Sequence, residues 1–314
     1  MRPVEAEGLV RHFGDIVAVD GVDLAVEQGE VFAFLGPNGA GKSTVVRMLT
    51  TLLKPTAGTA RVAGFDVVRQ PAEVRRAIGV ALQDAAIDPL MTGHELLRLQ
   101  SVLHGIPRPL AERRGAELLE RVGLTAAAGR RVGTYSGGMR RRLDLALSLV
   151  HEPEVLFLDE PTTGLDPMSR LNLWEEVRSL NDERGTTVFL TTQYLEEADQ
   201  LAGRIAIIDG GRIVREGDPG NLKAAVGSPT LAVEVRAGEE DRVRQLLSAC
   251  GEIRPSRPGT VAVGLAGGAA DMAGVVRALD DAAVAVEGME LHQPTLDDVF
   301  ADATGRRLEG AESH

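Results

Sequence analysis

Short apolar runs in the first two thirds of the chain predict strands that are buried in a core. They cover residues 31–35, 78–82, 155–160 and 187–192. Residues 5–27 instead alternate between apolar and polar positions and are rich in valine, which is typical of short antiparallel strands. A glycine pair joins two further apolar segments, residues 205–209 and 212–216, and predicts a hairpin. Buried strands combined with antiparallel strands favour a mixed sheet architecture.

The hydrophobic period becomes helical from Thr92 to about Val150. Thr92 and Glu95 form a capping-box pattern that predicts a helix through Leu103. A second helix is expected over residues 110–122, and a third is expected after Ser136. We therefore expect a helical subdomain at about residues 84–150 within an α/β domain that spans residues 1–227.

A second domain is predicted over residues 228–314. Its hydrophobic pattern gives the order β-α-β-β-α-β, which is typical of a ferredoxin-like α+β module. The expected elements cover residues 231–236, 240–250, 252–254, 260–264, 270–281 and 284–289. A short terminal helix is predicted at residues 294–300. The role of this second domain stays open between regulation, dimerisation and permease docking.

Composition narrows the function classes. The chain has 314 residues and a formal net charge of −12, so we expect no nucleic-acid partner. The single cysteine, Cys250, cannot form an intrachain disulfide, which fits a reducing compartment such as the cytoplasm. The six histidines show no metal-ligand spacing. We find no signal core and no long apolar stretch, so any membrane-spanning part is expected to belong to another chain.

The strongest chemical signal follows the apolar run at residues 31–35. Gly36 to Ser43 match G-x-x-x-x-G-K-[ST], in which glycines let backbone N–H groups close around phosphate oxygens. Lys42 supplies a positive charge, Ser43 supplies a hydroxyl to Mg²⁺, and the helix that begins near Lys42 directs its positive end at the anion. An ordinary glycine turn would not account for Lys42, Ser43 and Thr44 at these positions. The segment predicts a nucleoside triphosphate site.

Polar residues end two other buried strands. Asp159 and Glu160 follow the run at 155–158, where ligands bind in open α/β sheets, and they are interpreted as an Mg²⁺-organising and a water-activating carboxylate. Gln83 ends another strand and is either a ligand of metal or water or a simple terminating residue. Phe13, ahead of the phosphate loop, either stacks on adenine or is a half-buried edge ring.

A second helix start suited to an anion stands at Ser136, Gly137 and Gly138. Three arginines follow at 140–142. Because consecutive residues point to different faces of a helix, a solvated or intersubunit ion-pairing role is expected for them rather than nucleic-acid binding.

These motifs, in this order and approximate spacing, resemble those of ATP-binding-cassette (ABC) ATPases over about residues 4–220. The Ser-Gly-Gly element separates that family from other P-loop enzymes. Three further segments resemble the daunorubicin/doxorubicin-resistance type of drug-efflux ATPase; they are residues 83–88, 190–199 and 294–300. The resemblance implies a P-loop ABC ATPase domain with a mixed sheet core, an antiparallel β subdomain and a helical subdomain.

The resemblance also implies a head-to-tail homodimer with two ATP molecules, each bound by one chain and closed by the Ser-Gly-Gly element of the other. It implies that Glu160 polarises water, that Gln193 occupies a γ-phosphate position, and that Asp166 lies across the dimer seam. Implied nucleotide contacts are Phe13, Gly36, Asn38, Gly39, Ala40, Gly41, Lys42, Ser43, Thr44, Ser136, Gly137, Gly138 and Asp166. Implied Mg²⁺ contacts are Ser43, Gln83 and Asp159, with Glu160, Gln193 and Gln83 as the catalytic set.

Two departures from the family pattern affect these expectations. Tyr135 and Met139 flank Ser-Gly-Gly where Leu and Gln are more usual, which leaves the phosphate-facing part intact. Gln193 stands where most relatives have histidine; an amide donates a hydrogen bond but cannot become cationic.

We expect an ATPase subunit on the cytoplasmic face of the membrane that powers drug or hydrophobic-compound export through a separate permease. The alternatives are a soluble ABC-type ATPase with a non-transport role and a nucleotide-gated module with weak hydrolysis.

Overall fold

The computed structural model describes residues 2–82, 87–236 and 238–306. Its contacts divide the described residues into two compact units, residues 2–219 and residues 220–306. This division falls at the start of helix α8 (Pro219–Val226), whereas the sequence places the domain boundary after residue 227. The two-domain assignment itself stays a prediction, and each unit is described separately below.

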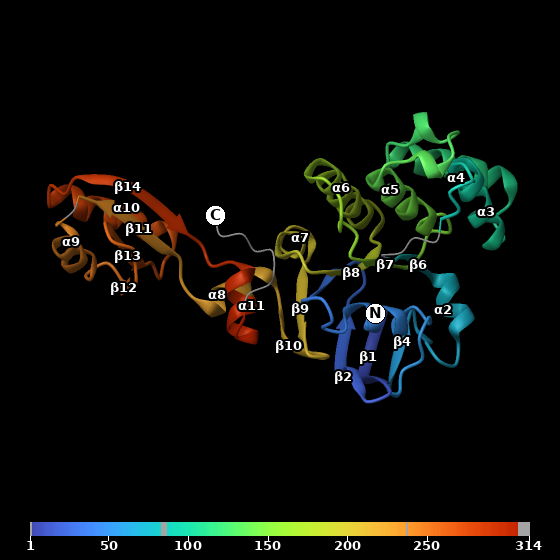
Figure 1. Ribbon diagram of the computed structural model, residues 1–314, viewed down its shortest axis with the longest axis horizontal. Helices are drawn as coiled ribbons and strands as arrows, with labels where there is room; N and C mark the ends of the chain where they lie inside the picture. The colour runs from blue at the N-terminus through green and yellow to red at the C-terminus, as the bar shows by residue number, and fades with distance from the viewer. Residues whose placement is uncertain (1, 83–86, 237, 307–314) are drawn as a thin grey trace. The chain divides into compact units, whose positions relative to one another are not determined.

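A six-stranded sheet forms the centre of the first unit (Figure 1). Its strands, in spatial order, are β10 (Arg212–Gly217), β9 (Arg204–Asp209), β3 (Val31–Leu35), β8 (Thr187–Thr192), β7 (Val155–Asp159) and β6 (Ile78–Ala81). All neighbours are parallel except β9 and β10, which form the predicted antiparallel hairpin. The mixed sheet expected from the sequence is confirmed.

The central strands are apolar along their whole length because they are buried. Every residue of β3, β7 and β8 is buried. Phe189 lies at the centre of an aromatic cluster, with its ring centroid 5.4 Å from those of Phe32 and Phe157 and 5.8 Å from that of Phe34. Burial of these rings contributes a large share of the hydrophobic stabilisation and fixes the strand ends that carry the polar residues.

A second, antiparallel sheet packs beside the first within this unit. Its strands, in spatial order, are β2 (Ile16–Val26), β1 (Val4–Phe13), β4 (Ala57–Val62) and β5 (Phe65–Asp66). Helix α1 (Lys42–Leu49) contacts strands of both sheets, and its buried residues belong to the core that the two sheets share. Helix α2 (Pro71–Ala77) connects β5 to β6. The predicted antiparallel β subdomain is confirmed.

The helical region consists of α3 (Gly93–Leu103), α4 (Arg108–Arg121) and α5 (Gly137–Ser148), with short 3₁₀ turns at Thr125–Ala127 and Val132–Thr134. These helices gather beyond the ends of β6 and β7 (Figure 1). The capping box at the start of α3 is confirmed, because Thr92 accepts from the amide of Glu95 while the Glu95 carboxylate accepts from that of Thr92. Two further helices follow β7 and β8; they are α6 (Pro167–Arg184) and α7 (Leu195–Leu201).

A stacked histidine pair links the helical region to the sheet. The rings of His104 and His151 lie 3.8 Å apart and nearly parallel, and His151 Nε2 is 2.9 Å from the carbonyl oxygen of Ile78. Burial first, and then the neighbouring His104, lowers the pKa of His151 to about 4. Protonation of His151 is therefore much less favourable in the folded chain than in the unfolded one.

This pair predicts acid destabilisation in a defined window. Because the folded pKa lies below the unfolded value of about 6.5, the contribution of His151 to the free energy of unfolding should fall as the pH drops from 6.5 towards 4, by up to about 1.4 kcal/mol per pH unit. Denaturant titrations at several pH values measure it. His151→Asn should flatten this slope, while the matched change His12→Asn at an exposed position should not. A wild-type slope that persists in His151→Asn would contradict the assignment.

The second unit contains a four-stranded antiparallel sheet with two helices. In chain order its elements are α8, β11 (Thr230–Val235), α9 (Glu240–Leu247), β12 (Glu252–Arg254), β13 (Thr260–Gly264), α10 (Ala269–Asp281), β14 (Val286–His292) and α11 (Leu296–Thr304). The spatial order of the strands is β12-β13-β11-β14. The predicted β-α-β-β-α-β order is present, and we retain the ferredoxin-like classification as a proposal. The terminal helix has a capping box formed by Thr295 and Asp298.

Candidate functional site

The loop between β3 and α1 is built around glycines that no other residue could replace without strain. Gly41 caps α1 with φ of +107°, a backbone conformation that L side chains rarely adopt, and a Cβ there would lie 2.5 Å from the carbonyl oxygen of Ala18. A Cβ at Gly36 would lie 2.4 Å from the carbonyl oxygen of Ile208. At the other loop positions, Asn38 and Gly39 are exposed and Ala40 is buried. The strand, loop and helix required for a phosphate-binding loop are all present.

Lys42 is held inside this loop. Its ammonium donates to the carbonyl oxygens of Gly36, at 2.8 Å, and Pro37, at 3.1 Å, and it lies 3.3 Å from Oε1 of Glu160. The side chains of Lys42 and Glu160 are only 3% and 7% exposed. Burial lowers the pKa of Lys42, and the charge of Glu160 opposes that shift. A buried ammonium surrounded by oxygen atoms is placed to interact strongly with an anion, because water screens it little.

Asp159 meets two hydroxyl groups at the end of β7. Its Oδ1 accepts from Ser43 Oγ, at 3.1 Å, and from Thr191 Oγ1, at 2.5 Å. A carboxylate and a serine hydroxyl in contact are hard oxygen ligands of the kind that Mg²⁺ uses together with phosphate oxygens. Ser43 and Asp159 are predicted from the sequence, but Thr191 is not, because its only signal is its position near the end of the neighbouring strand β8.

Glu160 has an unusual backbone conformation directly after β7. Its φ is +49°, in the left-handed region, which is uncommon for a non-glycine residue and is typical of functional sites. Its amide donates to the backbone oxygen of Thr191, at 3.1 Å, and its Oε2 accepts from Thr163 Oγ1, at 3.4 Å. At this left-handed residue the backbone leaves the direction of β7, and the Glu160 carboxylate lies beside Lys42.

The arginine run was misinterpreted from the sequence. Arg141 is not solvated: its guanidinium donates to the carbonyl oxygens of Leu82, Asp159, Glu160 and Pro161. Arg142 on the same helix donates to Val122 at the end of α4, and Arg140 donates to Tyr135. Arg140 is exposed, as expected, whereas Arg141 and Arg142 are partly buried and bind backbone carbonyls of their own chain.

The Ser-Gly-Gly element forms a second group of site residues at the start of α5. Ser136 is the N-cap and accepts from the amide of Met139, at 3.2 Å. Asp166 caps α6 and accepts from the amide and hydroxyl of Ser169, and these bonds lower the pKa of Asp166. A Cβ at Gly138 would lie 2.9 Å from Ser169 Oγ, so Gly138 allows the starts of α5 and α6 to approach closely.

The remaining predicted residues stand apart from these contacts. Phe13 ends β1, is 44% exposed, and has the Arg11 guanidinium 4.5 Å from its ring centroid. Gln193 follows β8 and is half-buried, and Thr44 lies half-buried on the first turn of α1. Gln83 lies outside the described residues. Among the described residues, no group of three or more His, Cys, Asp or Glu side chains could by itself hold a metal ion.

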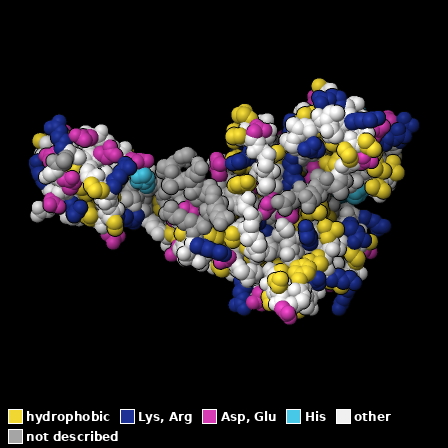
Figure 2. Space-filling view, viewed as in Figure 1, with side chains coloured by type: hydrophobic (Ala, Val, Ile, Leu, Met, Phe, Trp, Pro, Cys, Tyr) yellow, Lys and Arg dark blue, Asp and Glu magenta, His cyan; other side chains and the backbone are white. Residues whose placement is uncertain are grey.

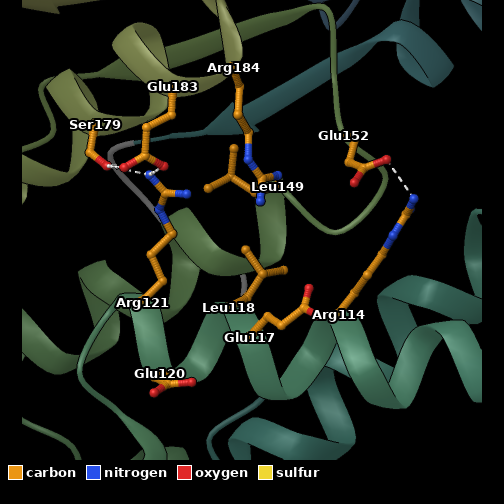
Figure 3. Close-up of a pocket in the computed structure, with 10 residues that line it drawn as sticks. All are labelled: Arg114, Glu117, Leu118, Glu120, Arg121, Leu149, Glu152, Ser179, Glu183 and Arg184. Carbon is orange, nitrogen blue, oxygen red and sulfur yellow. Dashed lines mark hydrogen bonds and ion pairs between the residues drawn. The ribbon is translucent and has the colours of Figure 1, made fainter.

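A hollow of about 430 Å³ lies between α4, α6 and the segment after α5 (Figure 3). It is separate from the phosphate loop and is lined by charged side chains of both signs. Arg121 reaches across it from α4 to Glu183, at 3.2 Å, and to Ser179, at 2.5 Å, and it also pairs with Glu176. Burial raises the pKa of Glu176 in spite of Arg121. Ion pairs in this hollow, which we call the Arg121 junction, therefore connect α4 to α6.

Loss of Arg121 is expected to destabilise the fold. Arg121→Ala leaves the mostly buried Glu176 without its cation, which should lower the free energy of unfolding by about 2–3 kcal/mol. Urea unfolding measures this loss. Arg108→Ala on the same helix is the matched control, because it removes an exposed pair with Glu112 and should change stability little. Equal effects of the two variants would contradict the importance of the Arg121 junction.

The known proteins that this chain resembles agree with the site geometry described above. A model of the ABC transporter family matches residues 19–163. The daunorubicin resistance ATP-binding protein DrrA3 of Streptomyces coeruleorubidus is 48% identical, with 98% of each chain covered. The doxorubicin resistance ATP-binding protein DrrA of Mycobacterium tuberculosis is 43% identical over 93% of this chain and 89% of its own.

Solved structures extend the similarity to the fold. An ATP-binding subunit of an ABC transporter matches with a TM-score of 0.65 and 26% identity, covering 71% of this chain and 92% of its own. A dimeric ATP-binding cassette with ADP and phosphate matches with a TM-score of 0.64 and 26% identity, covering 68% and 98%. With a phosphate loop, two carboxylates at a strand end, a Ser-Gly-Gly helix start and near full-length relatives, this chain belongs to the ATP-binding proteins of the ABC transporter family.

Proposed function

We propose that this protein is the ATP-hydrolysing subunit of an exporter whose membrane-spanning permease is a separate chain. One observation carries the proposal: Lys42, Ser43, Asp159 and Glu160 come from two elements far apart in sequence and meet within hydrogen-bond or ion-pair distance. No helix in the described part of the chain is long and apolar enough to cross a membrane. The permease is accordingly assigned to a partner.

The roles of these residues follow from their chemistry. Lys42 binds the β- and γ-phosphate oxygens, together with the backbone N–H groups of the loop from Gly36 to Gly41. Ser43 and Asp159 hold Mg²⁺, which neutralises phosphate charge, and their mutual contact supports this fit. Glu160 orients and polarises the attacking water. We also assign Gln83 to water or metal and Gln193 to the γ-phosphate.

We assign the remaining site residues to a head-to-tail homodimer. Ser136, Gly137 and Gly138 at the start of α5 would bind the γ-phosphate of the partner's ATP, because a helix N-terminus presents unpaired N–H groups to an anion. Phe13, exposed at the end of β1, would stack on adenine, and Asp166 would lie at the seam. The dimeric structure of a related cassette supports this arrangement.

The helical region offers a surface for the permease. Leu99, Val102 and Leu103 are exposed near the C-terminal end of α3, and hydrophobic side chains are visible over this region in Figure 2. Exposed apolar side chains that cluster are typical of protein interfaces. We place the protein on the cytoplasmic face of the membrane through this contact. Since relatives that are 48% and 43% identical are named for daunorubicin and doxorubicin resistance, we propose drug or hydrophobic-compound export.

Co-expression tests the whole proposal. Purified chain should hydrolyse Mg·ATP and form an ATP-dependent dimer by light scattering, and it should co-purify with a candidate permease encoded beside it. Turnover that requires RNA or DNA would instead favour a soluble machine with a non-transport role. Binding of ATP without turnover, even with the permease, would favour a nucleotide-gated module.

Gln193 has a specific expected effect. Gln193→Ala removes the amide that would donate to the γ-phosphate, and loss of one such bond should lower kcat about tenfold with a smaller change in KM. Steady-state kinetics measure this, with Gln200→Ala on the exposed side of α7 as the control. Unchanged turnover in Gln193→Ala would contradict its role as a γ-phosphate sensor.

A further inference from the structure

Arg141 makes a set of contacts that neither the phosphate-binding chemistry nor helix packing requires. Its side chain is 12% exposed and extends from α5 to the ends of two strands. Nε donates to Pro161 O at 2.9 Å, and Nη1 donates to Leu82 O at 2.5 Å. Nη2 donates to Asp159 O at 2.7 Å and to Glu160 O at 3.0 Å. One guanidinium therefore binds four backbone carbonyls from two segments.

These carbonyls control the conformation of Glu160. The carbonyl of Asp159 belongs to the peptide unit before the Glu160 Cα atom, and the carbonyl of Glu160 belongs to the unit after it. Fixing both units fixes φ and ψ of Glu160, and these two angles set the direction of its Cβ. The angle φ is +49°, which costs free energy for glutamate and persists only when surrounding contacts impose it.

The charge and shape of the Arg141 guanidinium are suited to holding these carbonyls in place. Asp144, one turn further along α5, has a carboxyl oxygen 3.8 Å from it, and burial raises the pKa of that carboxyl to about 7. Asp159, Glu160 and Glu197 also attract the guanidinium, although burial outweighs them and lowers the pKa of Arg141. A planar guanidinium offers five donors in a rigid fork, whereas the ammonium of lysine offers three donors from one point. Lysine could replace the charge but not the simultaneous contacts.

We infer that Arg141 is a positioning residue for ATP hydrolysis: it holds Glu160 in its left-handed conformation and so aims the carboxylate at the attacking water. This rests on the proposed role of Glu160. Because Arg141 belongs to α5, which has Ser136 as its N-cap and begins with Gly137 and Gly138, it also connects that helix to the carboxylate of the same chain. It further binds Leu82, the residue that precedes Gln83.

Steady-state kinetics of two neighbouring arginine variants test this inference. Arg141→Gln should lower kcat by about 10–100-fold, because a misplacement of about 1 Å at a reacting group has effects of this size, while KM for Mg·ATP stays within about threefold. Arg142→Gln is the matched control: it also removes an arginine that donates to a backbone carbonyl outside α5, and it should keep kcat within about threefold. Equal losses of kcat in both variants would overturn the inference.

Two further variants keep the test decisive. If Arg141→Gln does not fold, Arg141→Lys is used instead, because it retains the charge and should fold. Its kcat should lie below the wild-type value, while its KM should stay near the wild-type value. A wild-type kcat in Arg141→Lys would overturn the inference. In a double-mutant cycle, Arg141→Gln should cause no further loss of turnover in Glu160→Gln, since Arg141 acts through Glu160. Additive losses would show that Arg141 acts elsewhere. Failure of the wild type to hydrolyse ATP would contradict the proposed function instead.

Discussion

Replacing Glu160 by glutamine is expected to lower ATP turnover by about 10²- to 10⁴-fold, the range for removal of a general base. Glutamine has the same shape and retains an oxygen that can accept from Thr163, but it cannot take a proton from water. The loss should therefore appear in kcat rather than in nucleotide binding. Phosphate release under saturating Mg·ATP measures it.

The same variant should accumulate as an ATP-bound dimer. Hydrolysis is the step that separates the two chains in the proposed mechanism, and glutamine also removes a negative charge that opposes the γ-phosphate. Light scattering should show a dimer with ATP and a monomer with ADP. Glu154→Gln, the same change at the exposed residue just before β7, is the control and should behave as the wild type. Turnover near the wild-type rate in Glu160→Gln would remove Glu160 from the mechanism.

Replacing Lys42 by alanine is expected to weaken Mg·ATP binding by roughly a hundredfold. The ammonium is buried, so its charge-assisted hydrogen bonds to phosphate are only weakly screened, and losing them costs about 3 kcal/mol. The variant also leaves the buried Glu160 without its cation. Isothermal titration with a non-hydrolysable ATP analogue measures the affinity directly.

A stability measurement separates loss of binding from loss of folding. Ligand that binds only the folded state raises the unfolding temperature, so Mg·ATP should stabilise the wild type but not Lys42→Ala. Lys54→Ala, at an exposed position of the same unit, should keep the full ligand-induced shift. If Lys42→Ala is folded and still stabilised as the wild type is, the ammonium does not bind the phosphates.

The local elements of the site could be predicted because each depends on residues close together in sequence. The phosphate loop needs a strand, glycines and a helix start in one stretch, and the structure has β3, the loop and α1 in that order. The capping box of α3 was equally readable from Thr92 and Glu95. Such local signals remain valid in the folded protein because residues close together in sequence also lie close together in space in any fold.

Helix α6 shows where local signals were not enough. This helix of 18 residues was not predicted, since only Leu173, Trp174, Val177 and Leu180 are buried and most other positions are polar. Asp166 followed by Pro167, an N-cap and a first-turn proline, was the available signal. The buried residues lie on one stripe of the helix, but the charged residues between them make the helical period of apolar positions hard to recognise in the sequence.

The sequence by itself determined which chemical groups this protein has: a phosphate loop at 36–43, carboxylates at 159 and 160, and a helix start at 136–138. Only the tertiary structure decided how they cooperate. Strand order brings Thr191 onto Asp159, and the left-handed turn brings Glu160 to Lys42. Arg141, which was expected to be solvated, donates to four carbonyls, because its partners lie at the ends of two strands that only folding places beside α5.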